Sequence, residues 1–400
     1  MPQISHRGLE MPSSPIRKLA PLANEAKSRG VKVYHLNIGQ PDLPTPQKGL
    51  DALKTITRKT LEYSPSEGYL PFREKLVGYY RKFGINDITH ENIIVTTGGS
   101  EAILFAFLAC MNPGDEMIMV EPGYANYISF AVTAGIKVVT VTSDIEDGFA
   151  LPPMEAFEEA ITKHTKAILL CNPNNPTGYV YSPEELQRIK ELVLKYDLYL
   201  IADEVYREFV YSGEPYVSAL TLGIPEHVIL VDSVSKRYSE CGIRIGMLVT
   251  RNRMVHDTVM KYCQARLSPP LLGQIVADAS VEGVEDYTKA CFDEYKARRD
   301  FFIKGLNSIP GVYSPMPHGA FYTIASLPVA DAEDFCRWCL TDFRMDNETV
   351  MMAPAAGFYR NPDLGQNQVR LAYVLKKDDL QRALILIRHA LKEYNNRIEF

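Results

Sequence analysis

The feature of this 400-residue sequence that most constrains its fold is a regular alternation of short apolar runs with stretches of helical spacing between residues 90 and 250. The runs have the length of strands, and glycine, proline or polar clusters bound them. The segment Ser182-Pro-Glu-Glu185 predicts the start of a helix, because it has the pattern of a capping box. Alternating strands and helices predict an α/β fold with a mostly parallel, helix-covered sheet. The expected strands cover residues 92–95, 116–121, 135–141, 166–170, 198–202 and 228–231.

Glycine-rich or polar motifs follow five of these runs at their carboxyl ends. They are Gly99-Ser100, Tyr124, Asn175, Asp203 and Lys236. The carboxyl ends of parallel strands meet along one edge of a sheet, and ligands bind outside that edge. Each motif alone has an ordinary structural explanation, but five of them at one edge predict a ligand site.

Lys236 lies just beyond a buried run, in the segment Ser233-Val-Ser-Lys236. A lysine at the mouth of such a strand can lose hydration, so that its pKa falls and its amine becomes a nucleophile. Arg244 follows eight residues later, before the apolar run 245–249, and could hold a phosphate or carboxylate with two hydrogen bonds. The alternative for Lys236 is an ordinary solvated side chain.

Several other segments suit a bound anion or a fixed ligand. The glycines in Thr97-Gly-Gly-Ser100 separate a strand from a helix, and a helix start of this kind can bind phosphate, although for this motif alone packing is the favoured explanation. The prolines of Asn172–Gly178 force an irregular, rigid loop at a strand end. Gly39 lies in a second rigid loop, whose backbone could approach a ligand closely. The alternative explanation for this loop is a plain turn at the end of a strand. Arg370 lies in an expected strand, where its guanidinium suits a carboxylate, the alternative being a surface ion pair.

Composition limits the partners. The net charge of −6 does not favour nucleic acid, and it requires local positive groups wherever an anion binds. No apolar stretch approaches the roughly 20 residues that a membrane span needs, and the N-terminus lacks the pattern of a signal peptide. Seven scattered cysteines indicate free thiols, so we expect a cytoplasmic protein. Cys336 and Cys339 fit the buried face of a helix better than a zinc site, and we expect no metal.

Three motifs in one order then carry a resemblance to a known family. They are Asn172-Pro-Asn-Asn-Pro-Thr-Gly178, Asp203-Glu-Val-Tyr206 and Ser233-Val-Ser-Lys236. With them the sequence resembles the class I/II aminotransferases of fold type I, which are aspartate-aminotransferase-like enzymes that use pyridoxal 5′-phosphate. The resemblance extends from Gly39 to Arg370. It implies a large cofactor-binding domain over 40–285 and a smaller α+β domain built from 1–39 and 286–400.

The resemblance also implies residue roles. Lys236 would carry the cofactor through a Schiff base, Asp203 would face the pyridine nitrogen, and Tyr206 with Asn175 would hydrogen-bond the phenolic oxygen. Tyr124 would stack on the ring. The phosphate would be held in the region of Gly99, Ser100, Glu101, Ser233 and Arg244, with Tyr63 reaching the phosphate of the neighbouring subunit in a homodimer. Gly39, Asn175 and Arg370 would bind the substrate, with Gly39 and Arg370 at its α-carboxylate.

Two positions depart from the family pattern. Ile243 stands where many relatives have tryptophan, which should affect only packing. The loop 353–359 replaces a Pro-Gly-Ser-like turn beside the expected substrate pocket, so it bears on substrate choice.

The expected activity is ping-pong transfer of an amino group between an α-amino acid and a 2-oxo acid, with aspartate and 2-oxoglutarate as the first expectation. A dicarboxylic substrate needs a second cation, for which Arg266 is a candidate, although a solvated helix end is an equal interpretation. The alternatives are a lyase on the same fold, such as a cysteine-S-conjugate β-lyase, or an aminotransferase of aromatic or alanine type. A non-catalytic binding protein of this fold is a further alternative that the retained Lys236 disfavours.

Overall fold

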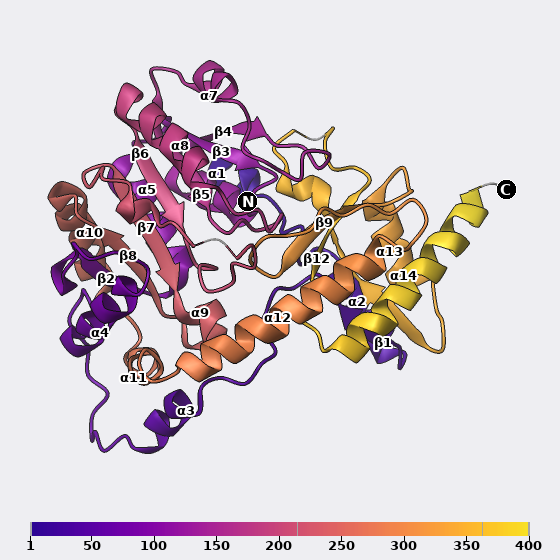
Figure 1. The fold of residues 1–400 in the computed structure, drawn as a ribbon, viewed down its shortest axis with the longest axis horizontal. Coiled ribbons are helices and arrows are strands. Elements are labelled where there is room, and N and C mark those ends of the chain that lie inside the picture. The colour runs from indigo at the N-terminus through magenta and orange to yellow at the C-terminus, as the bar shows by residue number, and fades with distance from the viewer. Residues whose placement is uncertain (1, 214, 362, 399–400) are drawn as a thin grey trace.

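The computed structural model describes residues 2–213, 215–361 and 363–398, and in them a seven-stranded sheet forms the centre of the larger lobe (Figure 1). The strand order is β2-β8-β7-β6-β5-β3-β4. β8 runs antiparallel to both of its neighbours, and the other pairs are parallel. The strands are β2 (Ile93–Thr96), β3 (Glu116–Glu121), β4 (Lys137–Thr142), β5 (Thr165–Cys171), β6 (Tyr199–Asp203), β7 (Val228–Ser233) and β8 (Gly246–Thr250).

Both faces of this sheet are covered, which explains why its strands read as continuous apolar runs. Successive residues of a strand point to opposite faces, so Met117 packs with one helix layer and Ile118 with the other. The first layer contains α5 (Gly98–Cys110), α6 (Asn126–Ala134) and α10 (Arg253–Arg266). The second contains α4 (Leu70–Arg81), α7 (Met154–Ala160) and α8 (Pro183–Tyr196).

The reversed direction of β8 matters for the site. Its first residue, Gly246, pairs with Ser233 at the carboxyl end of β7 and with Thr96 at the carboxyl end of β2. The residues just before β8, including Arg244, therefore lie at the same edge of the sheet as the ends of the parallel strands. Because β8 is antiparallel, Arg244, which shortly precedes it in the chain, lies at the edge where the parallel strands end.

The smaller lobe combines segments from both ends of the chain (Figure 1). A parallel pair joins β1 (Lys32–His35) to β10 (Glu348–Met351). A second sheet has the antiparallel order β11-β12-β9, from β11 (Ala353–Pro354), β12 (Gln368–Ala372) and β9 (Tyr322–Ser326). The helices are α2 (Ala20–Ser28), α13 (Ala332–Thr341) and α14 (Lys377–Ile398). The predicted α/β class, with its mostly parallel helix-covered sheet, is confirmed.

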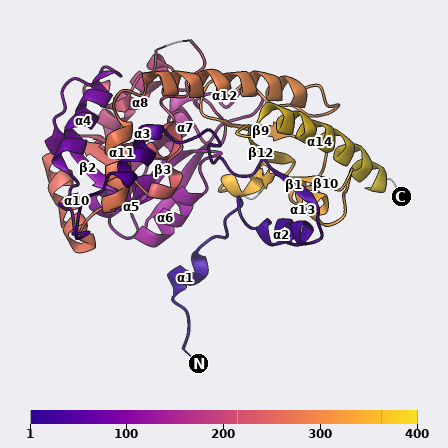
Figure 2. The same ribbon diagram turned by 90° about the horizontal axis from the view of Figure 1, so that it is seen from below.

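One long helix connects the two lobes. α12 (Glu285–Leu306) runs from the large sheet to the smaller lobe in both views, while the N-terminus extends away from the body (Figure 2). The remaining helices are α1 (His6–Glu10), α3 (Gln47–Lys54), α9 (Val234–Arg237) and α11 (Leu271–Ser280). We propose the domain boundaries expected above, 40–285 against 1–39 with 286–400; residues 1, 214, 362, 399 and 400 lie outside the described residues.

Some local predictions need correction. The apolar spacing of residues 14–29 predicts one helix, but α2 begins only at Ala20, because Pro21 occupies its first turn and the preceding residues form separate turns. The charged region 271–306 reads from the sequence as one long helical region, but the structure has two helices there, broken near Gly283 (φ 66°). The segment Pro122-Gly-Tyr124 predicts the start of a helix, but α6 begins only at Asn126, so Tyr124 lies in the preceding loop.

One prediction about the cysteines is confirmed. Cys336 and Cys339 are buried on α13, and all seven cysteines are free thiols. Within the described ranges, no helix has the length and apolar character that a membrane crossing requires. In the same part of the chain, no group of three or more His, Cys, Asp or Glu side chains is arranged to hold a metal ion.

The predicted capping box of α8 is present, and it provides a test of local stability. The Glu185 amide donates to Ser182 Oγ at 3.1 Å, and the Ser182 amide donates to the Glu185 carboxylate at 2.7 Å. We expect Ser182→Ala to lower the free energy of unfolding by about 1 kcal/mol, because the first turn loses its side-chain acceptor. Urea unfolding measures this difference. The exposed Ser13→Ala should show no comparable loss, and equal effects of both changes would contradict the prediction.

Candidate active site

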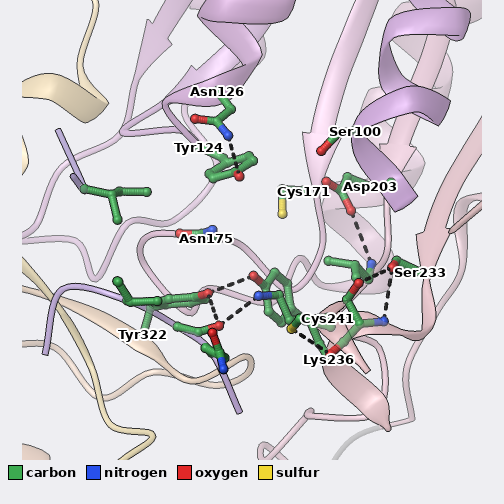
Figure 3. Close-up of a pocket in the computed structure, with 18 of the residues that line it drawn as sticks. Ser100, Tyr124, Asn126, Cys171, Asn175, Asp203, Ser233, Lys236, Cys241 and Tyr322 are labelled. Atoms are coloured by element: carbon green, nitrogen blue, oxygen red, sulfur yellow. Dashed lines mark hydrogen bonds between the residues drawn. The ribbon is translucent and has the colours of Figure 1, made fainter. Parts of the chain in front are cut away.

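A cavity of about 530 Å³ opens at the carboxyl edge of the central sheet, a size typical of small-molecule sites (Figure 3). Most of the residues predicted for the site line this one cavity. Residues from both lobes contribute, since Arg370 comes from β12 and Asp203 from the end of β6. The predicted residues on its wall are Gly39, Gly99, Ser100, Tyr124, Asn175, Asp203, Tyr206, Ser233, Lys236, Arg244 and Arg370.

Lys236 extends from the short helix α9 into the cavity, where its Nζ donates to the carbonyl oxygen of Gly39 at 2.8 Å (Figure 3). The expected fall in its pKa is wrong for the protein alone. Burial lowers the pKa of Lys236, but the phenol of Tyr322, the thiol of Cys241 and the phenol of Tyr124 outweigh that effect, and the pKa is raised. Each of these neighbours favours the charged ammonium form of the lysine.

The turn that carries Lys236 is fixed from below by a buried charge network. Asp232, at the end of β7, accepts from Arg207 at 2.8 Å and from Arg237 at 2.9 Å. Tyr80 donates to the same carboxylate at 2.9 Å. The two guanidiniums lower the pKa of Asp232 against the effect of burial. Because Arg237 is the chain neighbour of Lys236, this network determines where the lysine side chain leaves the sheet edge.

Asp203 is buried at the end of β6 and is the only carboxylate on the cavity wall among the described residues. Tyr127 donates to its Oδ2 at 2.7 Å, and the Val205 amide donates to its Oδ1 at 3.3 Å. The pKa of Asp203 is raised to about 6, because burial outweighs the opposing effect of the hydrogen bond from Tyr127. A cationic ligand group facing Asp203 would stabilise the charged carboxylate that burial disfavours.

Arg370 is buried in the centre of β12, so it is no surface ion pair. Its guanidinium donates to Asn175 Oδ1 at 3.2 Å and to the carbonyl oxygen of Asn37, and it faces the rings of Tyr322 and Phe358. Its Nε has no hydrogen-bond partner. No carboxylate pairs with it among the residues described. A buried cation without an anionic partner is costly, and this favours an anionic ligand at this position.

Tyr322, at the start of β9, connects several of these residues and is absent from the sequence predictions. Its hydroxyl lies 3.0 Å from the hydroxyl of Tyr206 and donates to the Gly39 carbonyl oxygen at 3.3 Å (Figure 3). This contact explains why residue 39 is a glycine, because a Cβ there would lie 1.9 Å from the Tyr322 hydroxyl oxygen. No local pattern around Tyr322 indicates this role, since it depends on how the two lobes meet.

The opposite end of the cavity is suited to a phosphate. Gly99 and Ser100 open α5, whose amides point outward at the positive end of the helix. Arg244 holds a left-handed conformation (φ 58°), and its guanidinium lies so close to Gly98 that a Cβ there would be 2.5 Å from Nη2. Ser233 lines the same region and donates to the Ile245 carbonyl oxygen at 2.8 Å.

Three predicted residues do not reach the cavity in the described chain. The Glu101 carboxylate turns away, accepting from the Thr97 amide at 2.8 Å and pairing with Arg266 at 3.1 Å. Arg266 is thereby excluded as the second cation of the pocket, because Glu101 and two backbone carbonyls hold its guanidinium. Tyr63 is 74% exposed and lies outside the cavity wall, so its predicted role stays a prediction.

Other cavity residues were not predicted from the sequence. Tyr127 and Asn126 follow Tyr124 closely, so a helix start beside a predicted site residue could have drawn attention to them. Asn126 donates to the Tyr124 hydroxyl at 2.8 Å, which orients that ring (Figure 3). Cys171 and Cys241 lie next to predicted motifs, whereas the N-terminal segment gives no signal. The unpredicted wall residues are Ile16, Arg17, Ile38, Gln40, Ile103, Asn126, Tyr127, Cys171, Val205, Ser235, Cys241 and Tyr322.

Fold and site together define an α/β enzyme that positions a lysine, a buried carboxylate and an unpaired arginine around one small-molecule cavity. The sequence matches the family described as aminotransferase class I and II over residues 31–387. An aspartate aminotransferase of Pyrococcus horikoshii is 30% identical over 97% of this chain and 97% of its own length. An aspartate/prephenate aminotransferase of Thermus thermophilus is 30% identical over 90% of this chain and 92% of its own length.

Solved structures agree with this assignment. An aspartate aminotransferase from Thermus thermophilus with maleate superposes with a TM-score of 0.88 at 29% identity, covering 98% of this chain and all of that one. An alanine aminotransferase from Pyrococcus furiosus superposes with a TM-score of 0.89 at 30% identity, covering 98% of this chain and all of that one. The chain belongs to the class I and II aminotransferase family, and it is an enzyme that transfers amino groups.

Asp203 provides a test of the site's electrostatics in the cofactor-free protein. The pKa of its carboxyl is raised to about 6 from the ordinary value of 3.8. As the pH rises, the unfolded chain therefore releases this proton before the folded protein does. This group therefore stabilises the folded protein fully below pH 4. As the pH rises to 6 the stabilisation is lost, and the free energy of unfolding falls by roughly 3 kcal/mol. Asp203→Asn cannot ionise, so its stability relative to wild type should rise across that interval.

Urea unfolding at several pH values measures the difference. Tyr127→Phe removes the hydrogen bond that lowers the pKa of Asp203, and it should extend the pH interval upward. A difference between Asp203→Asn and wild type that is independent of pH would contradict the assignment.

Proposed function

We propose that Lys236 binds pyridoxal 5′-phosphate covalently and that this site transfers an amino group between an α-amino acid and a 2-oxo acid. The observation that carries the proposal is the shared cavity of Lys236, the buried Asp203 and the buried, carboxylate-free Arg370. These groups match a cofactor aldehyde, a ring nitrogen and a substrate carboxylate. When bound, the cofactor withdraws the electrons released as a bond at the substrate Cα breaks.

The residues present fit this cofactor. Asp203 would hold a proton on the ring nitrogen, because an opposite charge stabilises the cation and relieves the burial of the carboxylate. Tyr206 and Asn175 would donate to the phenolic oxygen, and Tyr124 would cover one ring face. At the other end Gly99, Ser100, Ser233 and Arg244 would hold the phosphate. This assignment excludes the Glu101 side chain, which pairs with Arg266.

Substrate orientation is the proposed task of Arg370 and Gly39. The planar guanidinium accommodates a carboxylate with two hydrogen bonds, and its unpartnered Nε is one available donor. Arg370 is already held by Asn175 and the Asn37 carbonyl, so it needs little reorganisation on binding. Fixing the α-carboxylate determines which bond of Cα is aligned for cleavage. The Nζ of Lys236, when it is not bonded to the cofactor, would accept the proton from Cα and so act as the general base.

We propose a homodimer, in which Tyr63 reaches the phosphate site of the partner. Support comes from exposed apolar side chains near Tyr63, on α3 and on the segments beside it. Exposed apolar surface of this kind is typical of an interface between subunits. The residues concerned are Leu50, Leu53, Leu61, Leu70, Leu267 and Leu272, which are 40–62% exposed. The seven free thiols support a reducing compartment such as the cytoplasm.

Lys236→Ala tests the proposed function. Turnover should fall by at least about a thousandfold, because the variant loses both the covalent attachment point and the general base. The measurement is a panel of amino donors with 2-oxoglutarate, followed by spectroscopy of the cofactor-loaded enzyme. Lys163→Ala, at an exposed lysine outside the cavity, is the matched control.

Two outcomes would contradict the proposal. Turnover of Lys236→Ala within a few-fold of wild type would exclude the role of the lysine. Release of pyruvate and ammonia without a 2-oxo acid acceptor, at rates above those of amino transfer, would instead identify a lyase.

A further inference from the structure

We propose that Arg17 binds the side-chain carboxylate of a dicarboxylic amino acid and so determines the substrate class. The inference rests on the proposed function, because it takes Arg370 as the site of the α-carboxylate. It replaces Arg266, the cation suggested by the sequence, which is held by Glu101 outside the cavity. Arg17 belongs to the N-terminal segment before α2, and it lies on the cavity wall beside Ile16, Ile38 and Gln40.

The backbone of Arg17 is tied directly to the Arg370 region. Asn37 donates through its side chain to the carbonyl oxygen of Ile16 at 2.8 Å, and its own carbonyl accepts from Arg370. One residue thus connects the peptide that precedes Arg17 with the guanidinium proposed for the α-carboxylate. The two cations of a dicarboxylate site would then be held in a defined relation through Asn37.

Neighbouring residues anchor this segment on both sides of Arg17. Pro15 packs so closely on Gly357 that a Cβ on that glycine would lie 2.5 Å from the proline ring. Ile16 packs against the small apolar cluster that includes Phe358, and Lys18 pairs with Glu333. Gly357 and Phe358 belong to the loop 353–359, which departs from the family pattern. That loop therefore bears on substrate choice through its support of the Arg17 segment.

The Arg17 side chain is free while its backbone is held. Its guanidinium is exposed, and it has no hydrogen bond, ion pair or ring contact with any residue in the described ranges. The other cations of the cavity all have partners: Lys236 donates to Gly39, and Arg244 donates to the Cys241 carbonyl oxygen at 2.8 Å. An immobilised backbone with an unpaired guanidinium is suited to a carboxylate that arrives with the substrate.

Charge matching leads to the same ligand. In the described chain the cavity wall carries four cations, which are Arg17, Lys236, Arg244 and Arg370, against the single carboxylate of Asp203. In the proposed function Lys236 is taken by the cofactor, Arg244 by its phosphate and Arg370 by the α-carboxylate. Arg17 is the cation left over, and a second carboxylate on the substrate is the group that would neutralise it.

Kinetics on the cofactor-loaded enzyme test the assignment. Arg17→Gln should lower the ratio of kcat/KM for aspartate to that for alanine by roughly tenfold to a hundredfold, the worth of a charge-assisted pair. Arg17→Lys keeps the charge but lacks the planar guanidinium. Its ratio of kcat/KM for aspartate to that for alanine should lie between those of wild type and Arg17→Gln. Arg29→Gln removes the same charge from an exposed position outside the cavity, and its ratio should match that of wild type.

Binding measurements separate this inference from the proposed function. Calorimetric titration of the cofactor-loaded protein with succinate, and with propionate as a monocarboxylate, reports on Arg17 without turnover. Arg17→Gln should weaken succinate at least tenfold more than propionate. Equal losses for both probes, or an unchanged aspartate-to-alanine ratio, would overturn the role of Arg17. A wild-type enzyme that transfers no amino group from any donor, but binds succinate through Arg17, would refute the proposed function alone.

Discussion

The site depends on one buried interaction, the contact of Asp232 with the guanidiniums of Arg207 and Arg237 under the end of β7. Ion pairs of this kind add little net stability over a well-packed apolar core, but removal of one partner leaves an uncompensated buried charge. The network is therefore better understood as a positioning device than as a source of stability. It fixes the turn from which Lys236 reaches the Gly39 carbonyl of the other lobe.

Above this charge-paired network the cavity is left electrostatically incomplete. Arg370 is buried without a carboxylate, Asp203 is buried with a raised pKa, and Arg17 is unpaired. Burial disfavours the charged forms of Arg370 and Asp203 in the protein alone, and a ligand group of opposite charge would stabilise each of the three residues. Arg370 and Asp203 are preorganised, since hydrogen bonds hold both side chains before any ligand enters.

The large sheet was readily predicted from the sequence because its signals are local. Apolar runs bounded by glycine and proline located strands such as β3 and β5, and Ser182 with Glu185 located the start of α8. The antiparallel direction of β8 was not predicted, because an apolar run does not show its direction. Element boundaries such as the start of α2 also differed, since Pro21 fits either a kink or a first turn.

The sequence by itself determined the fold class, the family and the residues that follow the parallel strands, because the carboxyl ends of such strands must share one edge. Tertiary structure alone decided that Arg370 is buried without a partner, that Glu101 turns to Arg266, and that Tyr322 and Arg17 face the cavity. These five residues lie on segments that meet only through packing between separate parts of the chain. Spacing along the chain carries no information on such contacts, so their chemistry becomes visible only in the folded chain.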